Sequence, residues 1–382
     1  MDFSWTDEQL AFKSRVMKFA RESLDHDVEA RDHASQFSRE NWQKCADFGL
    51  LGLSVPGTYS DGRDIEFLTA MLAMEGMGYA CPDNGLTFAL NAQMWTVQLP
   101  IVHFGSEQQK KTYLPAMCRG DQIGAHVITE PHSGSDVYSL KTHAQKCEEG
   151  YRLNGSKRFI SLAPVADIAL VFATIDPQLG KWGITAFLVD CASKGVHRGP
   201  VKEKMGLRTV PMSDITFKDC IVPEANRLGP EGSGMSLSTS SLEWERCCIL
   251  ASQIGAMERQ LEIATDYAKN RQQFGQTIGK FQSVSGRIVD MKLRLETARL
   301  LLYKVAWLKS TGQPAMTEAA LLKLYLGECF VQSSLDAIQV HGGLGYMTES
   351  GIERDLRDAI GGTIYAGTSD IQRNIVATLL GL

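Results

Sequence analysis

A polar segment from Ile128 to Asp136 carries groups that could hold a charged or ring-shaped ligand. It combines the hydroxyl groups of Thr129, Ser133 and Ser135 with a turn at Gly134. Backbone N–H groups at such a turn can approach an anion or a ring edge closely. The same composition is also common in ordinary surface loops. A binding role therefore depends on which motifs accompany the segment elsewhere in the chain.

Other residue types that carry chemistry are scattered. The nine cysteines form an odd set without a CxxC pair, and the eight histidines show no i, i+4 pair or other ligand spacing. Neither a disulfide framework nor a metal site is therefore expected, and a reducing, cytoplasmic location fits best. No GxGxxG motif follows a strand pattern, which argues against a nicotinamide site.

The composition is that of an ordinary globular protein of 382 residues, 44% of them hydrophobic. The 39 basic and 44 acidic residues nearly balance, and no basic stripe exists that could follow a phosphate backbone. We therefore expect no nucleic-acid partner. The N-terminus lacks the pattern of a signal peptide, and no apolar run reaches the roughly twenty residues of a membrane helix, so no membrane association is expected.

Hydrophobic periodicity divides the chain into three parts. Apolar residues recur every three or four positions from residue 6 to about 111, which predicts helices. Between about 120 and 232 the pattern changes to short strand-like runs, such as 168–173 and 184–189. Helical periodicity then returns, most clearly over 288–302. The predicted fold class is mainly α with a central β domain. The predicted domains are an N-terminal helical domain (1–120), a middle β domain (121–232) and a C-terminal helical bundle (233–382).

Several separated motifs accompany the polar segment in a recognisable order. They are Arg271–Gly275, Gln339–Gly343, Arg357-Asp358 and Ile364–Arg373. Together with 128–136 they make the chain resemble the acyl-CoA dehydrogenase family over essentially its whole length. The resemblance implies the fold of that family, in which a helical domain, a β-barrel-like middle domain and a C-terminal four-helix bundle follow one another. It also implies an FAD cofactor between the β domain and the C-terminal helices.

The resemblance assigns flavin contacts to residues of the middle domain. His126, Ile128 and Thr129 would line the flavin ring, and Gly134 and Ser135 would approach the pyrophosphate. Phe159 and Ser161 would flank the ring. The family more often has Trp at the position of Phe159, and Phe supplies an aromatic wall without the indole N–H donor.

A second set of residues resembles those that reach the flavin of a neighbouring subunit. It comprises Arg271, Phe274, Gln282, Gln339 and Gly343. Thr368 would belong to the same dinucleotide contact, whereas Asp370 stands where many relatives have Gln. These assignments imply a homotetramer, or at least a dimer.

The reaction of the family requires a base that takes the α proton of an acyl thioester. Many relatives carry that Glu after the Tyr of the Ile-Tyr-Glu-Gly-Thr motif, but Ala366 occupies the position here. A minority carry it on an earlier helix before an Arg, and Glu245 matches that arrangement. The alternative is that Glu245 forms a surface ion pair, as Glu beside Arg usually does on a helix. Glu243, two positions away, should point elsewhere.

Substrate contacts follow from the same comparison. The backbone N–H at Ala366 would polarise the thioester carbonyl, and Tyr365 and Arg246 would lie against the substrate. Trp244 would help to close a short pocket, or would equally be a core residue.

Within the family, the sequence looks most like the flavoenzymes that oxidise prolyl groups on a peptidyl carrier protein. The segments that carry this impression are 244–248, 257–262 and 291–296. The product would be a pyrroline or, after a second oxidation, a pyrrole. Two alternatives stay open: a dehydrogenase for short or branched acyl-CoA, and a catalytically silent thioester-binding flavoprotein. No motif distinguishes oxygen from an electron-transfer flavoprotein as the electron acceptor.

Overall fold

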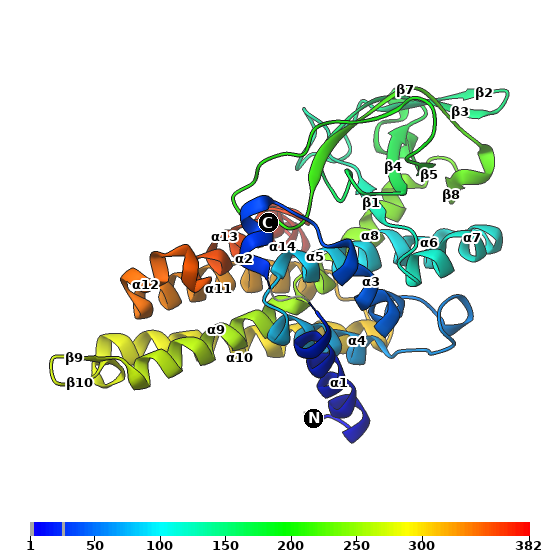
Figure 1. Cartoon of the computed structure of the whole chain (residues 1–382). Helices are drawn as coiled ribbons and strands as arrows, with labels where there is room; N and C mark the ends of the chain where they lie inside the picture. The colour runs from blue at the N-terminus through cyan, green and yellow to red at the C-terminus, as the bar shows by residue number, and fades with distance from the viewer. Residues whose placement is uncertain (1–3, 25–26) are drawn as a thin grey trace.

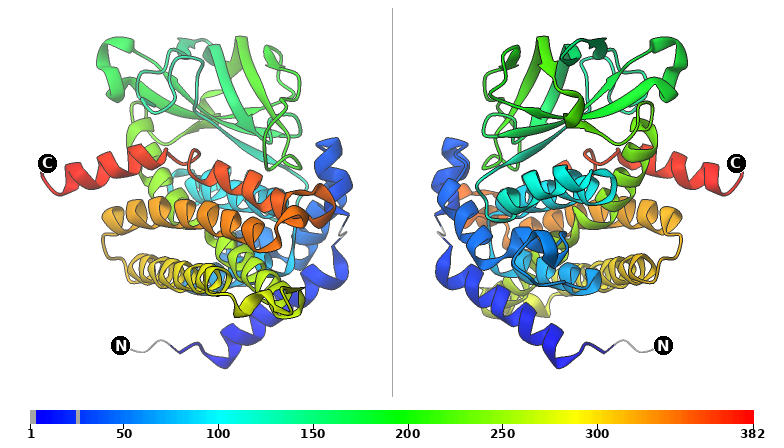
Figure 2. Two further views of the ribbon diagram at one scale, coloured as in Figure 1. Left: turned by 90° about the vertical axis from the view of Figure 1, so that its left-hand side faces the viewer. Right: turned by 90° about the vertical axis from the view of Figure 1, so that its right-hand side faces the viewer.

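Helices from both ends of the chain form one body, and a β-sheet domain lies against it. The structure, a computed structural model, describes residues 4–24 and 27–382. Figure 2 shows the sheet domain above layers of helices, with the last helix projecting from the side. The predicted fold class, mainly α with a central β domain, is confirmed.

The N-terminal region is helical, and side-chain caps stabilise most of its helices. The helices are α1 (Asp7–Ser23), α2 (Val28–Ala34), α3 (Arg39–Phe48), α4 (Phe67–Ala80), α5 (Asn84–Gln93), α6 (Leu99–Phe104) and α7 (Glu107–Cys118). Thr6 and Gln9 form a capping box at the start of α1, and Ser106 and Gln109 form another at α7. Each box satisfies backbone N–H groups that have no partner within the helix.

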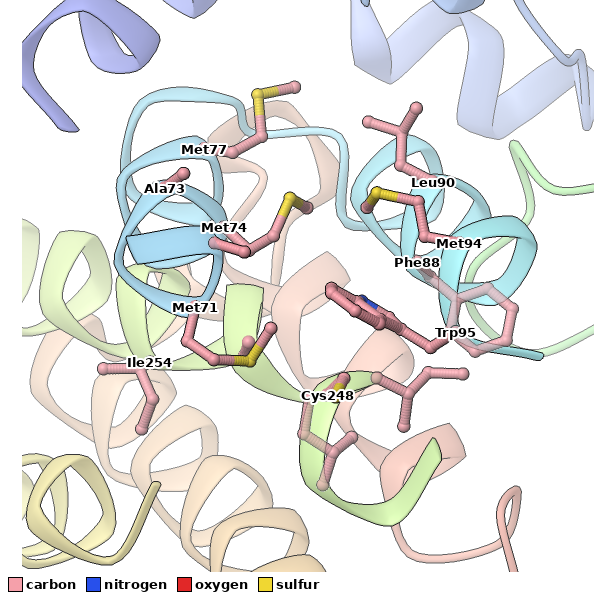
Figure 3. Close-up of a cluster of buried hydrophobic side chains, with 14 of the residues drawn as sticks. Met71, Ala73, Met74, Met77, Phe88, Leu90, Met94, Trp95, Cys248 and Ile254 are labelled. Carbon is pink, nitrogen blue, oxygen red and sulfur yellow. The ribbon is translucent and has the colours of Figure 1, made fainter. Parts of the chain in front are cut away.

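A methionine-rich core joins the N-terminal helices to the C-terminal ones. Figure 3 shows Met71 and Met74 of α4 on one side of this core, with Met94 and Trp95 opposite. All four side chains are buried. Methionine fills irregular gaps well because it is unbranched and flexible. The core is therefore shared between the two helical regions.

Two glycines let α4 approach α9 (Ala251–Asn270) closely. A Cβ at Gly78 would lie 1.8 Å from the backbone oxygen of Ser252, and one at Gly255 would lie 1.9 Å from that of Glu75. No larger residue fits either position. The close contact fixes α9, and with it the end of the preceding helix, against the N-terminal domain.

A π-helical turn, η3 (Met94–Gln98), continues α5 and leads into α6. All five of its residues are buried, and it packs against α8 (Gly234–Cys248). Such turns accommodate one residue more than an α-helical turn and are frequent near functional sites.

The middle domain is built on one mixed sheet. Its strands are β1 (Gly124–Val127), β2 (His143–Cys147), β3 (Gly150–Ser161), β4 (Ile168–Thr174), β5 (Ile184–Asp190), β6 (Val196–Arg198), β7 (Met212–Val222) and β8 (Arg227–Leu228). The order is β6-β7-β3-β2-β4-β5-β8, and β1 pairs with β4 in parallel. All residues of β4 are buried, as the apolar run at 168–173 predicts, and β7 alternates between buried and less buried positions over its first half.

The C-terminal region contains the longest helices. The helices of this region are α8, α9, α10 (Gln282–Ser310), α11 (Met316–His341), α12 (Gly343–Tyr346), α13 (Ile352–Gly362) and α14 (Ser369–Leu379), of which α9, α10 and α11 are the longest. The predicted helix over 288–302 lies inside α10. A short hairpin of β9 (Gln272–Gln273) and β10 (Gln276–Thr277) joins α9 to α10, and the sequence pattern did not predict it. No helix in the described ranges is both long and apolar enough to cross a membrane.

The exact domain boundaries stay a prediction. The first strand begins at Gly124 and α8 begins at Gly234, close to the predicted limits of the middle domain.

Candidate active site

Glu245 has the environment of a proton acceptor. Its side chain is buried near the end of α8, and burial raises its pKa to about 7 although the charges of Arg246 and Lys323 act in the opposite direction. Within the part of the chain that the structure describes, its carboxylate forms no hydrogen bond and no ion pair. A buried carboxylate without a partner is unfavourable for stability and is free to act on a ligand.

The neighbouring Glu243 is in a different situation. Its carboxylate pairs with the ammonium group of Lys309 on α10. Lys309 also lies over the ring of Trp244, 4.5 Å from its centroid. The charge of Glu243 is therefore neutralised by a lysine of another helix.

Ala366 is buried in the turn between α13 and α14, and its neighbour Tyr365 is near enough to Glu245 for their charges to interact. Ala366 adopts a left-handed backbone conformation with φ of 57°. Lys323 of α11 donates a hydrogen bond to the carbonyl oxygen of Gly367 at 2.5 Å, and Gln372 donates to the carbonyl oxygens of Ala366 and Gly367 at 3.0 Å each. The turn is thus held from two helices.

Tyr365 links this turn to a small polar cavity. Its ring packs against Phe88 with centroids 4.8 Å apart, and its hydroxyl accepts a hydrogen bond from Gln253 at 3.0 Å. Burial and the negative charges of Asp358 and Glu245 raise the pKa of Tyr365 well above its usual range. Tyr365, Gln253 and Asp358 line the cavity together with Asn84. The tyrosine therefore stays protonated.

Arg246 is buried beside Glu245 without a hydrogen bond from its guanidinium group in the described residues. Burial lowers its pKa. Trp244 instead packs edge-on against Phe67, with ring centroids 4.9 Å apart, and near His103. Its recorded contacts are those of a core residue, so its role at the substrate stays a prediction.

Two serines extend the polar face of α8 beyond Glu245. Ser238 and Ser241 precede it by seven and four residues, so at 100° per residue the three side chains lie within about 60° of one another. Both serines are buried, and neither hydroxyl has a hydrogen-bond partner among the residues that the structure describes. Unsatisfied buried hydroxyls in a row suggest a polar ligand along this face.

A fully buried ion pair supports the segment after β1. The ammonium group of Lys157 on β3 lies 2.9 Å from a carboxylate oxygen of Glu130. It also donates a hydrogen bond to the carbonyl oxygen of Ile128 at 3.0 Å. The backbone N–H of Arg158 donates to the carbonyl of Thr129 at 2.8 Å. Burial keeps the Lys157 pKa low, at about 8, despite the Glu130 carboxylate. The pair therefore fixes residues 128 and 129 against β3.

The predicted flavin contacts of the middle domain lie around this support. His126 is on β1, and its Nε2 atom is buried without a hydrogen-bond partner in ranges 4–24 and 27–382. Burial lowers its pKa to about 4, so the ring is neutral at pH 7. Ser161 ends β3, and Gly134 and Ser135 lie in an exposed loop.

Phe159 is an exposed aromatic ring on β3 with 52% of its surface accessible and φ of 59°. Its backbone N–H donates to Asp214 at 3.1 Å. The guanidinium carbon of Arg158 lies 4.7 Å from the ring centroid, and the ammonium of Lys202 lies 5.7 Å away. An aromatic ring held outward in this way is available to stack on a ligand.

The residues predicted to serve a neighbouring subunit gather elsewhere. Arg271, Phe274, Gln282, Gln339 and Gly343 are exposed, and Phe274 is 93% accessible at the tip of the β9–β10 hairpin. Figure 1 shows this hairpin and α12 at the end of the helical body away from the sheet. Within one chain, these residues therefore lie away from the predicted flavin contacts at residues 126–161.

Thr368 and Asp370 lie at the start of α14. The Thr368 hydroxyl accepts a hydrogen bond from the backbone N–H of Ile371 at 3.2 Å and caps the helix. Asp370 forms an exposed pair with Arg373 at 3.4 Å. The Thr368 hydroxyl acts as the acceptor in this cap, so its O–H group can still donate a hydrogen bond to a ligand. Asp370 instead pairs with Arg373 on its own helix.

Comparison with known proteins identifies the family. Family models match the chain in three parts: the N-terminal domain of acyl-CoA dehydrogenase over residues 6–121, the middle domain over 125–220 and the C-terminal domain over 232–381. The chain belongs to the acyl-CoA dehydrogenase family. The predicted family and enzyme class are thereby confirmed.

Individual members of the family are similar over their full length. An L-prolyl-[peptidyl-carrier protein] dehydrogenase from Pseudomonas fluorescens is 42% identical, with 100% of both chains covered. The structure of the prolyl acyl carrier protein oxidase AnaB matches with a TM-score of 0.98 at 47% identity, covering 99% of this chain and 100% of that one. The structure of PigA with FAD and proline matches with a TM-score of 0.97 at 40% identity, covering 100% of both.

Sequence patterns did not single out several residues of this region. Lys323, Gln372 and Lys157 lie within helices or strands where a lone polar residue usually faces water. Ser238 and Ser241 lie in a serine-rich stretch that resembles any polar helix surface. A spacing of seven and four residues before Glu245 is the one signal that could have indicated the serines.

Proposed function

We propose that this chain is an FAD-dependent enzyme that oxidises an L-prolyl group carried as a thioester on a peptidyl carrier protein. It would remove hydrogen from Cα and the neighbouring ring atom and give a pyrroline or, after a second oxidation, a pyrrole. The names of the relatives support the substrate, and PigA supports FAD and proline as ligands of this fold. The observation that carries the proposal is the buried carboxylate of Glu245, which has no hydrogen bond or ion pair within the described residues and interacts with Tyr365, the neighbour of Ala366.

The residues present fit an FAD molecule. Phe159 offers an exposed aromatic face, His126 has an unsatisfied buried nitrogen, and a Cβ at Gly134 would meet no atom within 4 Å. We propose that these residues hold the flavin together with Ile128, Thr129, Ser135, Ser161 and Thr368. When bound, FAD would supply the acceptor for the hydride that leaves the substrate.

The protein side of the reaction then follows from its own groups. Glu245 accepts the α proton, and its burial makes the carboxylate a stronger base once substrate excludes water. The N–H of Ala366 would hydrogen-bond the thioester oxygen where negative charge develops. The buried guanidinium of Arg246 provides donors for the substrate beside the base, and Tyr365 would close the pocket.

An anaerobic substrate comparison tests the proposal. Purified protein would be mixed with prolyl-carrier protein, butyryl-CoA and isovaleryl-CoA while the flavin absorbance is followed. Bleaching by prolyl-carrier protein and not by the CoA esters is expected. Faster reduction by isovaleryl-CoA would replace the proposal with a branched-chain acyl-CoA dehydrogenase, and no reduction by any thioester would indicate a silent binding protein. Reoxidation in air, with and without an electron-transfer flavoprotein, identifies the acceptor.

We further propose that the chain assembles into a homotetramer. Val289, Leu293, Leu300 and Trp307 of α10 are exposed and follow one stripe of the helix, because each step is four or seven residues. Gln372 is the one buried residue recorded for α14, which projects from the body. A partner would bury both surfaces. Light scattering tests the assembly, and a monomeric FAD-loaded protein would refute it. The odd, dispersed cysteines favour a cytoplasmic location.

A further inference from the structure

Lys323 is a buried cation without an ion pair. The side chain is fully buried on α11, and burial lowers its pKa to about 8. In the described part of the chain its ammonium lies within 4.0 Å of no carboxylate, and its recorded hydrogen bond goes to the carbonyl oxygen of Gly367 at 2.5 Å. Burial of an unpaired charge is costly, so a purely structural role would be served better by an apolar residue.

The hydrogen bond of Lys323 acts on a strained turn. Ala366 has φ of 57°, a conformation that a residue with a Cβ adopts at a cost. Gln372 donates hydrogen bonds to the carbonyl oxygens of Ala366 and Gly367, at 3.0 Å each. Lys323 and Gln372 therefore share the carbonyl of Gly367, and together they hold the backbone on which the Ala366 N–H is presented.

The charge of Lys323 acts on Glu245. The titratable groups near enough to interact with the charge of this carboxylate are Arg246 and Cys248 from its own helix, Lys323 from α11 and Tyr365 from the turn. Burial keeps Cys248 and Tyr365 neutral at pH 7. Only the two cations therefore favour the ionised form of Glu245, and Lys323 is the one that is also bound to the turn.

We propose that Lys323 is a positioning residue with two effects on the reaction. Its hydrogen bond to Gly367 fixes the turn that presents the Ala366 N–H, and its positive charge favours the ionised form of Glu245. Gln372 provides the first effect without the second. The inference rests on the proposed function for the role of Glu245 as the base, but the electrostatic coupling can be measured without any reaction.

A matched pair of variants separates the two effects. Lys323→Met and Gln372→Leu each remove a hydrogen bond to the Gly367 carbonyl, but only Lys323→Met also removes a charge. Infrared difference spectra of substrate-free, FAD-loaded protein would follow the protonated carboxyl band that is absent in Glu245→Gln. The midpoint of that band should move upward by about 1 pH unit in Lys323→Met and stay unchanged in Gln372→Leu. Lys323→Arg, which keeps the charge, should titrate like the original protein.

The same pair is then compared with substrate. The pH at which flavin reduction is half-maximal should rise in Lys323→Met only, whereas kcat should fall in both variants. An unchanged infrared midpoint in Lys323→Met, or an equal shift in Gln372→Leu, would overturn the inference. If Lys323→Met does not fold, Lys323→Gln replaces it under the same criteria. A shifted infrared midpoint in protein that prolyl-carrier protein fails to reduce would refute the proposed function and leave the coupling established.

Discussion

Glu243 and Glu245 lie two residues apart on α8 and are in opposite electrostatic situations. Glu243 is paired with Lys309, whereas the buried carboxylate of Glu245 has no partner in the described chain. The helix thus presents one neutralised carboxylate and one that is available for chemistry.

The first prediction uses this pair as site and control. Glu245→Gln preserves shape but cannot accept a proton, so flavin reduction by the true substrate should slow by roughly 10²- to 10⁴-fold while FAD stays bound. Glu243→Gln should keep the rate within about threefold, because the Glu243 carboxylate is already occupied by its ion pair with Lys309. Stopped-flow absorbance measures both. Wild-type kinetics in Glu245→Gln would show that the base is another residue.

The second prediction concerns the pH dependence of the reaction. Glu245 accepts a proton only when ionised, and burial raises its pKa to about 7. The rate of flavin reduction should therefore increase as pH rises through about 7 and level off above it. Anaerobic rates measured from pH 5.5 to 9 test this. A rate that is already maximal at pH 5.5 would contradict the raised pKa.

The third prediction concerns stability. The pKa of Glu245 is about 7 in the folded protein and 4.5 for an ordinary glutamate, so the folded state holds the proton more tightly. The resulting stabilisation is complete below pH 4.5 and is lost as pH rises through 7, by at most about 3 kcal/mol per chain. Glutamine does not ionise, so Glu245→Gln does not show this loss of stability as pH rises. The variant should gain thermal stability relative to the original protein between pH 5 and pH 8, as calorimetry would show.

The fourth prediction concerns the buried pair of Lys157 and Glu130. Lys157→Met leaves a buried carboxylate without its cation and should destabilise the protein by about 3 to 5 kcal/mol. FAD retention should also weaken, because the carbonyl of Ile128 loses its donor. Lys44→Met breaks an exposed i, i+4 pair with Glu40 and should cost less than about 0.5 kcal/mol. Equal losses in the two variants would show that the buried pair has no special role.

The fifth prediction concerns the exposed hairpin. Arg271→Ala should weaken FAD retention by about 1.5 to 3 kcal/mol if the guanidinium reaches a phosphate of a neighbouring subunit. Its exposure means that the fold of the single chain should not change. FAD release on gel filtration and the unfolding temperature of FAD-free protein distinguish the two effects. Unchanged FAD retention would remove Arg271 from the cofactor site.

The sequence predicts the layout of the fold because periodicity is local. The runs at 168–173 and 184–189 became β4 and β5, and the pattern at 288–302 became part of α10. The hairpin β9–β10 was missed because two-residue strands carry no periodic signal. The motif Arg271–Gly275, which overlaps this hairpin, nevertheless contributes to the resemblance to the family.

Some residues of the candidate site could likewise be proposed from the sequence, and others could not. Glu245 could be proposed as the base from the sequence, because Ala366 occupies the position where many relatives carry it, and this role stays a prediction. Lys323 and Gln372 could not, because their importance comes from a turn that is 44 and five residues away in the chain, respectively. Trp244 illustrates the reverse: its residue type suggests a pocket wall, whereas its contacts are with Phe67 and His103.

The π-helical turn η3 has a consequence for how enzymes of this architecture could diversify. It lies against α8, the helix that carries Glu245, and it contains one residue more than a regular turn. Deletion of one residue within Met94–Gln98 would convert the segment to a continuous α-helix without shifting α6 along the chain by a full turn. Loss of a single codon could thus change the surface that packs against α8 while the flanking helices keep their register.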